Sequence, residues 1–167
     1  SWINDDDELT PFSLQRSINF LDNQSNYLAV VGSLNYRILD KNNIRLNQVN
    51  FLTFVVATFG PNIIPQPGSL IRRKDITWKD LLNSNYKYAM DLDLFLRIRK
   101  IGKIGKIKQI QAIMNWHVDS ITVSNRKKAN KEAFQIRLVY AENIFVKIMN
   151  YFFYFPTIIL LKIFSRI

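Results

Sequence analysis

The sequence predicts an α/β fold, because stretches typical of strands alternate with stretches typical of helices. Residues 27–34 form an apolar run of strand length, and residues 104–116 are strand-like, with Lys106, Lys108, Ile110, Ala112 and Met114 at alternating positions. Between them, residues 91–101 carry apolar side chains at helical spacing, and Gly102 follows as an expected stop. Strands that alternate with helices are typical of a sheet covered by helices.

The shorter elements follow from local signals. Residues 2–4 are expected to end a strand, and Thr10 and Pro11 are expected to begin a helix as its N-cap and first helical residue. Further predicted elements are a helix at 50–58 stopped by Gly60, a short strand at 69–71 and a helix at 75–83.

From Lys127 the pattern is helical to the end of the sequence, so we divide the chain into an α/β unit at 1–123 and a helical tail at 124–167. Residues 151–161 are almost wholly apolar, although a helix that spans a membrane needs about 20 apolar residues. Two interpretations stay open: a helix that lies on a membrane surface, or a helix that completes the core.

Composition excludes several classes of chemistry. The 167 residues contain no Cys, which excludes disulfides, zinc–thiolate sites and thiol catalysis. The net charge of +10 attracts anions, with basic clusters at 97–108 and 126–131, but no nucleic-acid-binding motif accompanies them. We therefore expect a cytoplasmic protein for which nucleic acid is not the partner. Because Ser1 is followed directly by an apolar pair, we also expect an N-terminally truncated domain.

The acidic cluster at residues 5–8 has two possible explanations. Carboxylates on a tight loop after a strand can bind a hard divalent cation, which prefers oxygen ligands. Alternatively, acidic residues suit the N-terminus of the helix expected at Thr10, and spacing alone favours this second explanation.

Two further positions have a structural and a catalytic interpretation. Asp91 and Asp93 open a predicted helix, where a carboxylate is usually a cap but can also act as a general base. His117 is the only histidine, and a lone histidine more often packs and forms hydrogen bonds than binds metal.

The order of five motifs resembles the family 2 glycosyltransferases over residues 1–123. Their C-terminal segments read W-L-N-S-D-D-x-L-x-P, V-x-G-D/S, P-Q-P-x-x-F-x-R-R, Y-A-x-D-Y-D-L-W-L-R and R-x-H-x-x-S-x-S/T. The matching segments here are WINDDDELTP (2–11), VVGS (30–33), PQPGSLIRR (65–73), YAMDLDLFLR (88–97) and WHVDSIT (116–122). Asn4 stands where many members have the first Asp of the Asp-x-Asp motif.

This resemblance implies a GT-A fold whose N-terminal half lies before Ser1, and an inverting transfer from a nucleotide-diphospho-sugar. The implied partners are that donor and a glycan or lipid-linked acceptor. The basic, aromatic tail itself suits contact with the inner face of the membrane. The implied cofactor is Mn or Mg. By resemblance, the site residues are Asp91 as catalytic base, Asp6, Asp7 and His117 at the metal, and Asn4, Asp5, Gln66 and Arg97 at the donor or acceptor.

Two other classes of function remain open from the sequence. One is a carboxylate–metal phosphotransferase or nuclease that uses residues 5–8 with Asp91 and Asp93. The other is a non-catalytic basic module that binds membranes or nucleic acid.

Overall fold

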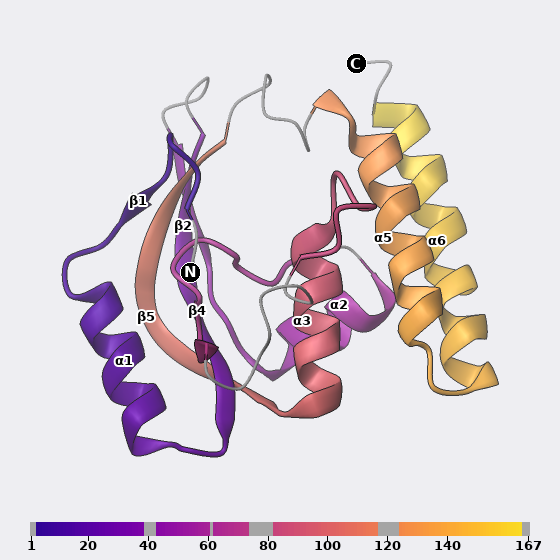
Figure 1. Ribbon diagram of the computed structural model, residues 1–167. Coiled ribbons are helices and arrows are strands. Elements are labelled where there is room, and N and C mark those ends of the chain that lie inside the picture. Colours follow the sequence, from indigo (N-terminus) through magenta and orange to yellow (C-terminus); the bar gives the residue numbers. More distant parts are fainter. Residues whose placement is uncertain (1–2, 39–42, 61, 74–81, 117–123, 165–167) are drawn as a thin grey trace.

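The computed structural model describes residues 3–38, 43–60, 62–73, 82–116 and 124–164 (Figure 1). These residues form a mixed sheet covered by helices, so the prediction of an α/β fold is confirmed. Among the described helices, none combines the length and the apolar character that a membrane crossing requires.

The sheet is built on two long strands. β2 (Tyr27–Ile38) and β5 (Lys103–Trp116) are parallel and pair along their whole length. β1 (Glu8–Leu9) pairs with β5 on its other edge, and β3 (Asn43–Asn47) and β4 (Leu70–Ile71) pair with β2, all antiparallel. β3 and β4 pair with opposite ends of β2, so the central ladder holds every other described strand.

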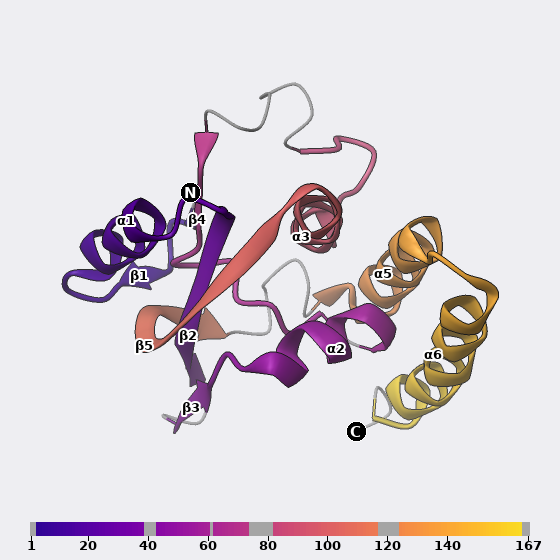
Figure 2. The ribbon, with the colours of Figure 1, turned by 90° about the horizontal axis from the view of Figure 1, so that it is seen from below.

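Helices cover both faces of this ladder (Figures 1 and 2). α1 (Ser13–Asn23) lies on one face, while α2 (Phe51–Phe59), α3 (Met90–Ile101) and α5 (Arg126–Tyr140) lie on the other. α6 (Ile144–Phe164) packs on the outside, against α5 and α2. The predicted helical tail is thus two helices, separated at residues 141–143, and Pro156 lies inside α6.

The core follows from the alternation of side chains along β2. Val31 packs into the cluster formed with α2, α3 and α5, whereas Val30 packs under α1 with Leu21 and Ile107. A strand that is buried on both faces reads as a continuous apolar run, as residues 27–34 do. The larger cluster contains Val31, Val49, Ala57, Ile64, Ala89, Leu92, Phe95, Leu96, Ala133 and Ile136.

α5 therefore belongs to the core, because Ala133 and Ile136 lie in the larger cluster. Residues 151–161, to which the two interpretations of the tail apply, lie in α6, which packs outside α5. Both interpretations therefore stay open for α6.

Two predicted helix starts are wrong. α1 begins at Ser13, because the Thr10 hydroxyl donates to the carbonyl of Ile110 on β5 (2.7 Å) and does not cap the helix. Phe12 occupies the N-cap position with a left-handed backbone (φ 62°). α3 begins at Met90 with Ala89 as N-cap, so Asp91 lies in the first turn and is not the cap.

Of the other predicted elements, some are confirmed and one is wrong. The helix predicted at 50–58 is confirmed as α2, where Asn50 and Thr53 form a reciprocal capping box, and Gly102 ends α3 as predicted. The strand end predicted at 2–4 is wrong for Ile3 and Asn4, which lie outside β1. Most of the helix predicted at 75–83 falls outside the described residues.

Gly32 provides a test of the central ladder. A Cβ at this position would lie 1.9 Å from Cγ of Gln111, which is fully buried on β5. We expect Gly32→Ala to lower the free energy of unfolding by about 1–3 kcal/mol, because the two paired strands must separate to admit a methyl group. Urea denaturation measures the change. Gly60→Ala is the control, since its Cβ would lie 3.3 Å from the nearest atom; equal losses in the two variants would contradict this packing.

Candidate functional site

The acidic loop is a closed turn fixed to the end of β5. The Asp7 N–H donates to the carbonyl of Asn4 (3.3 Å), and the Asn4 side-chain amide donates to Oδ2 of Asp7 (3.0 Å). The backbone N–H of Asn115 donates to Oδ1 of Asp7 (3.1 Å). Both oxygens of Asp7 thus accept hydrogen bonds that hold the loop in place.

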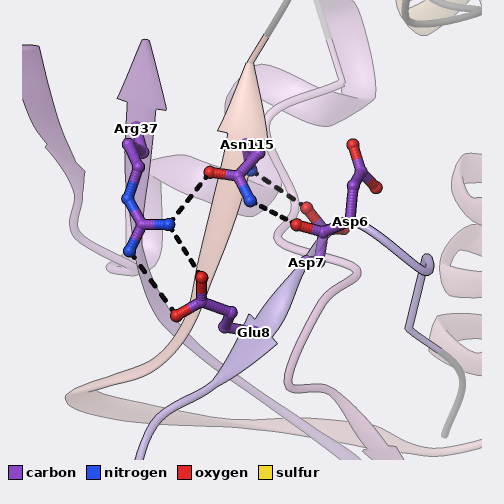
Figure 3. Close-up of polar contacts among 5 residues, drawn as sticks. All are labelled: Asp6, Asp7, Glu8, Arg37 and Asn115. Carbon is purple, nitrogen blue, oxygen red and sulfur yellow. Dashed lines mark hydrogen bonds and ion pairs between the residues drawn. The ribbon is translucent and has the colours of Figure 1, made fainter. Parts of the chain in front are cut away.

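Asn115 connects this loop to β2 (Figure 3). Its side-chain amide donates to the backbone carbonyl of Asp6 and accepts a hydrogen bond from Arg37 (3.3 Å). Arg37 also forms an ion pair with Glu8 (2.7 Å), which lowers the pKa of that carboxyl. Figure 3 shows that the Asp6 carboxylate points away from this network. The loop is therefore rigidly attached while the side chains of Asp5 and Asp6 are exposed.

The Asp7 side chain is partly buried, and its pKa is shifted. Burial raises the pKa of its carboxyl, and the hydrogen bond from Asn115 opposes this while the charges of Asp6 and Asp5 add to it. A cation bound at this loop would lower that pKa, since it favours the charged form. The side chains of Asp5 and Asp6 are exposed, whereas both oxygens of Asp7 accept hydrogen bonds within this network.

The predicted metal set is not assembled among the described residues. Within them, no three histidine, aspartate or glutamate side chains gather into a group that could hold a metal ion. His117 lies outside the described residues, so its place beside Asp6 and Asp7 stays a prediction.

Asp91 has the electrostatic environment of a candidate base. The Asn62 side-chain amide donates to one of its oxygens (2.8 Å), and the backbone N–H of Leu92 donates to the other (2.8 Å). Burial raises the pKa of Asp91, partly offset by these two hydrogen bonds and reinforced by the charge of Glu132. The carboxyl is thus held in place by neutral donors and binds its proton more tightly than an ordinary aspartate.

Glu132 on α5 positions the start of α3. Its carboxylate accepts hydrogen bonds from the backbone N–H groups of Lys87 (3.1 Å), Tyr88 (2.6 Å) and Ala89 (2.7 Å). A carboxylate is favourable beside the N-terminal N–H groups of a helix. The sequence analysis missed Glu132 and Asn62, because these contacts join residues far apart in the chain and no local pattern marks them.

Two other predicted site residues are occupied by structural contacts. Arg97 pairs with Asp93 one helical turn earlier and not with Asp91, and Asp93 also accepts a hydrogen bond from the Tyr140 hydroxyl (2.7 Å). The Gln66 residue is 8% exposed. Its backbone carbonyl accepts hydrogen bonds from the N–H (3.1 Å) and the hydroxyl (2.7 Å) of Ser69.

The two parts of the candidate site lie at the same end of the sheet. α3 runs antiparallel to β5, so the Asp91 end of α3 and the Asn115 end of β5 are on one side (Figure 1). Ligands of open α/β folds bind beyond the carboxyl ends of the strands. The acidic loop, Asp91 and Gln66 come from three separate segments of the chain.

Comparisons with known proteins do not assign a family or a function to the chain. No protein-family model matches the chain, and a search of curated proteins gives no match.

Glu132→Ala tests the attachment of α3 to α5. Removing the carboxylate leaves three backbone N–H groups without their acceptor, so we expect the free energy of unfolding to fall by about 2–4 kcal/mol. Urea denaturation measures this loss. Glu142→Ala, an exposed position just after α5, should change stability by less than about 0.5 kcal/mol. A similar small change in both variants would show that Glu132 does not hold the helix start.

Proposed function

We propose that this chain is the acceptor-side half of a metal-dependent, inverting glycosyltransferase of the GT-A type. It would transfer a sugar from a nucleotide-diphospho-sugar to a hydroxyl of a glycan or lipid-linked acceptor, on the cytoplasmic side. The observation that carries the proposal is Asp91. The resemblance gives this residue the role of base, and burial raises its pKa in the described site.

In this reaction Asp91 must accept a proton, and its pKa must suit that role. Its carboxylate accepts the proton of the acceptor hydroxyl as that oxygen attacks the anomeric carbon, and the bond from that carbon to the diphosphate breaks. Attack from the side opposite the leaving group inverts the anomeric configuration. A base is most effective when its pKa lies close to the working pH, so the raised pKa of Asp91 suits this role.

The acidic loop would hold the donor side. Asp6 and Asp7, with His117, are the proposed metal ligands, and Asn4 and Asp5 lie next to them in the loop. Carboxylate oxygens suit a hard cation, and the hydrogen bonds from Asn115 to Asp7 and to the Asp6 carbonyl already fix the loop. When bound, Mn or Mg offsets charge on the departing diphosphate.

The environment of Asp93 argues against a phosphotransferase or nuclease. That alternative uses Asp93 with Asp91 as a second working carboxylate. Asp93 is 2% exposed, and Arg97 and Tyr140 both bind it. A carboxylate engaged in this way supports the helix and is not open to a substrate, so we favour sugar transfer.

Asp91→Asn tests the proposed base. Transfer is measured as release of nucleoside diphosphate in the presence of acceptor. We expect kcat to fall by at least about a hundredfold, the contribution typical of a general base, with little change in donor binding. Asp22→Asn, at an exposed position on α1, is the matched control. Normal transfer by the Asp91 variant would exclude the assignment.

The pH dependence gives a second test. Transfer requires ionised Asp91, so activity falls as pH drops through its pKa. Asn62 donates to the carboxylate and thereby lowers that pKa, so Asn62→Ala should shift the acidic limb of kcat/KM to higher pH. Asn19→Ala, exposed on α1, should leave the limb in place. A shift of the limb to lower pH in the Asn62 variant would contradict the proposed electrostatics.

A further inference from the structure

The outward side of α6 is almost entirely apolar. Six large side chains on this side are 57–72% exposed. We call them the outer face of α6: Ile144, Phe145, Ile148, Phe152, Phe155 and Ile159.

These residues form a continuous stripe. Ile144 and Phe145 are adjacent and the later members follow at intervals of three or four residues, which places all six on one side of the helix. The stripe from Ile144 to Ile159 is about 22 Å long at 1.5 Å per residue. A contiguous exposed apolar patch of this kind is uncommon on a soluble monomer and marks a surface that contacts another body.

The inner side of α6 combines aromatic contacts with polar groups: Tyr151 and Tyr154 pack on Phe134 of α5, and Phe153 lies near Phe59 of α2. Asn150 is fully buried, donates to the carbonyl of Val146 (2.9 Å) and accepts from Nε of Arg137 on α5 (2.9 Å). Burial lowers the pKa of Arg137 to about 10, so this residue is still charged at neutral pH. A buried polar contact between α5 and α6 thus lies within an aromatic interface, while the outer face of α6 remains apolar.

Either a second copy of the chain or a lipid surface could cover the outer face of α6, and charge distinguishes between them. α5 and α6 are antiparallel, so the exposed Lys127, Lys128 and Lys131 at the start of α5 lie at the same end of the pair as the C-terminal part of α6 (Figure 1). Lys147 is exposed near the opposite end of α6. A chain of net charge +10 repels a second copy of itself and is attracted to anionic lipid.

We propose that the outer face of α6 lies on an anionic lipid surface, with its Phe and Ile side chains below the head groups and the flanking lysines at the lipid phosphates. This arrangement explains why the apolar face and the cations occur together on the α5–α6 pair. It does not depend on the proposed sugar transfer, and binding to vesicles is measured without donor or acceptor.

Co-sedimentation of the full chain with vesicles tests the proposal. We expect binding to vesicles of phosphatidylcholine mixed with phosphatidylglycerol, weaker binding to phosphatidylcholine alone, and loss of binding at high salt. Ile148→Asp and Phe152→Asp should each lower the partition coefficient at least about tenfold, because each places a charge in the apolar layer. Val139→Asp is the matched control, since Val139 is 66% exposed but lies on α5, outside the outer face of α6.

A double variant, Lys127→Glu with Lys131→Glu, tests the role of the lysines. It should weaken binding to the anionic vesicles and leave the weak binding to phosphatidylcholine unchanged. All substituted side chains are exposed, so thermal unfolding should be similar in every variant. Wild-type binding by the Phe152 variant would overturn the proposal. A second outcome would also overturn it: the wild type is a dimer in light scattering, Phe152→Asp is a monomer, and neither protein binds vesicles. This result would show that a second copy covers the outer face of α6.

Discussion

The parallel pairing of β2 with β5 is the interaction on which the rest of the structure depends. This ladder joins residues far apart in the chain, and every other described strand pairs with one of its two members. It is buried on both faces, by α1 on one side and by α2, α3 and α5 on the other. Its close packing is visible at Gly32, where the side chain of Gln111 fills the space that a Cβ would need.

Both parts of the candidate site, the acidic loop and Asp91, are attached to this ladder. Asn115, near the end of β5, holds the acidic loop through Asp6 and Asp7. Asp91 lies at the start of α3, which turns into β5 at Gly102, and Glu132 binds the N–H groups that precede the same helix. Because α5 supplies Glu132 and also supports α6, the proposed lipid-facing surface and the proposed base share one rigid helix, although each can be tested separately.

Local patterns predict much of the fold but only part of the site. The apolar run of β2, the alternation in β5 and the stop of α2 at Gly60 are signals within short stretches, and the structure confirms all three elements. The start of α1 could not be predicted, because Thr10 bonds to Ile110, a hundred residues away, and so does not cap the helix. Arg97 was expected near a ligand, but its partner Asp93 lies one turn away on the same helix. The roles of Asn62, Asn115 and Glu132 depend on tertiary contacts that leave no mark in the sequence.

The central claim is that this site transfers sugar. The most direct measurement is the anomeric configuration of the product, followed by NMR, when the protein is given Mn, a panel of nucleotide-diphospho-sugars and a hydroxyl acceptor. Our account predicts release of nucleoside diphosphate together with a new glycosidic bond of inverted configuration. Consumption of no donor in the panel, together with hydrolysis of a phosphodiester by the same preparation, would contradict it.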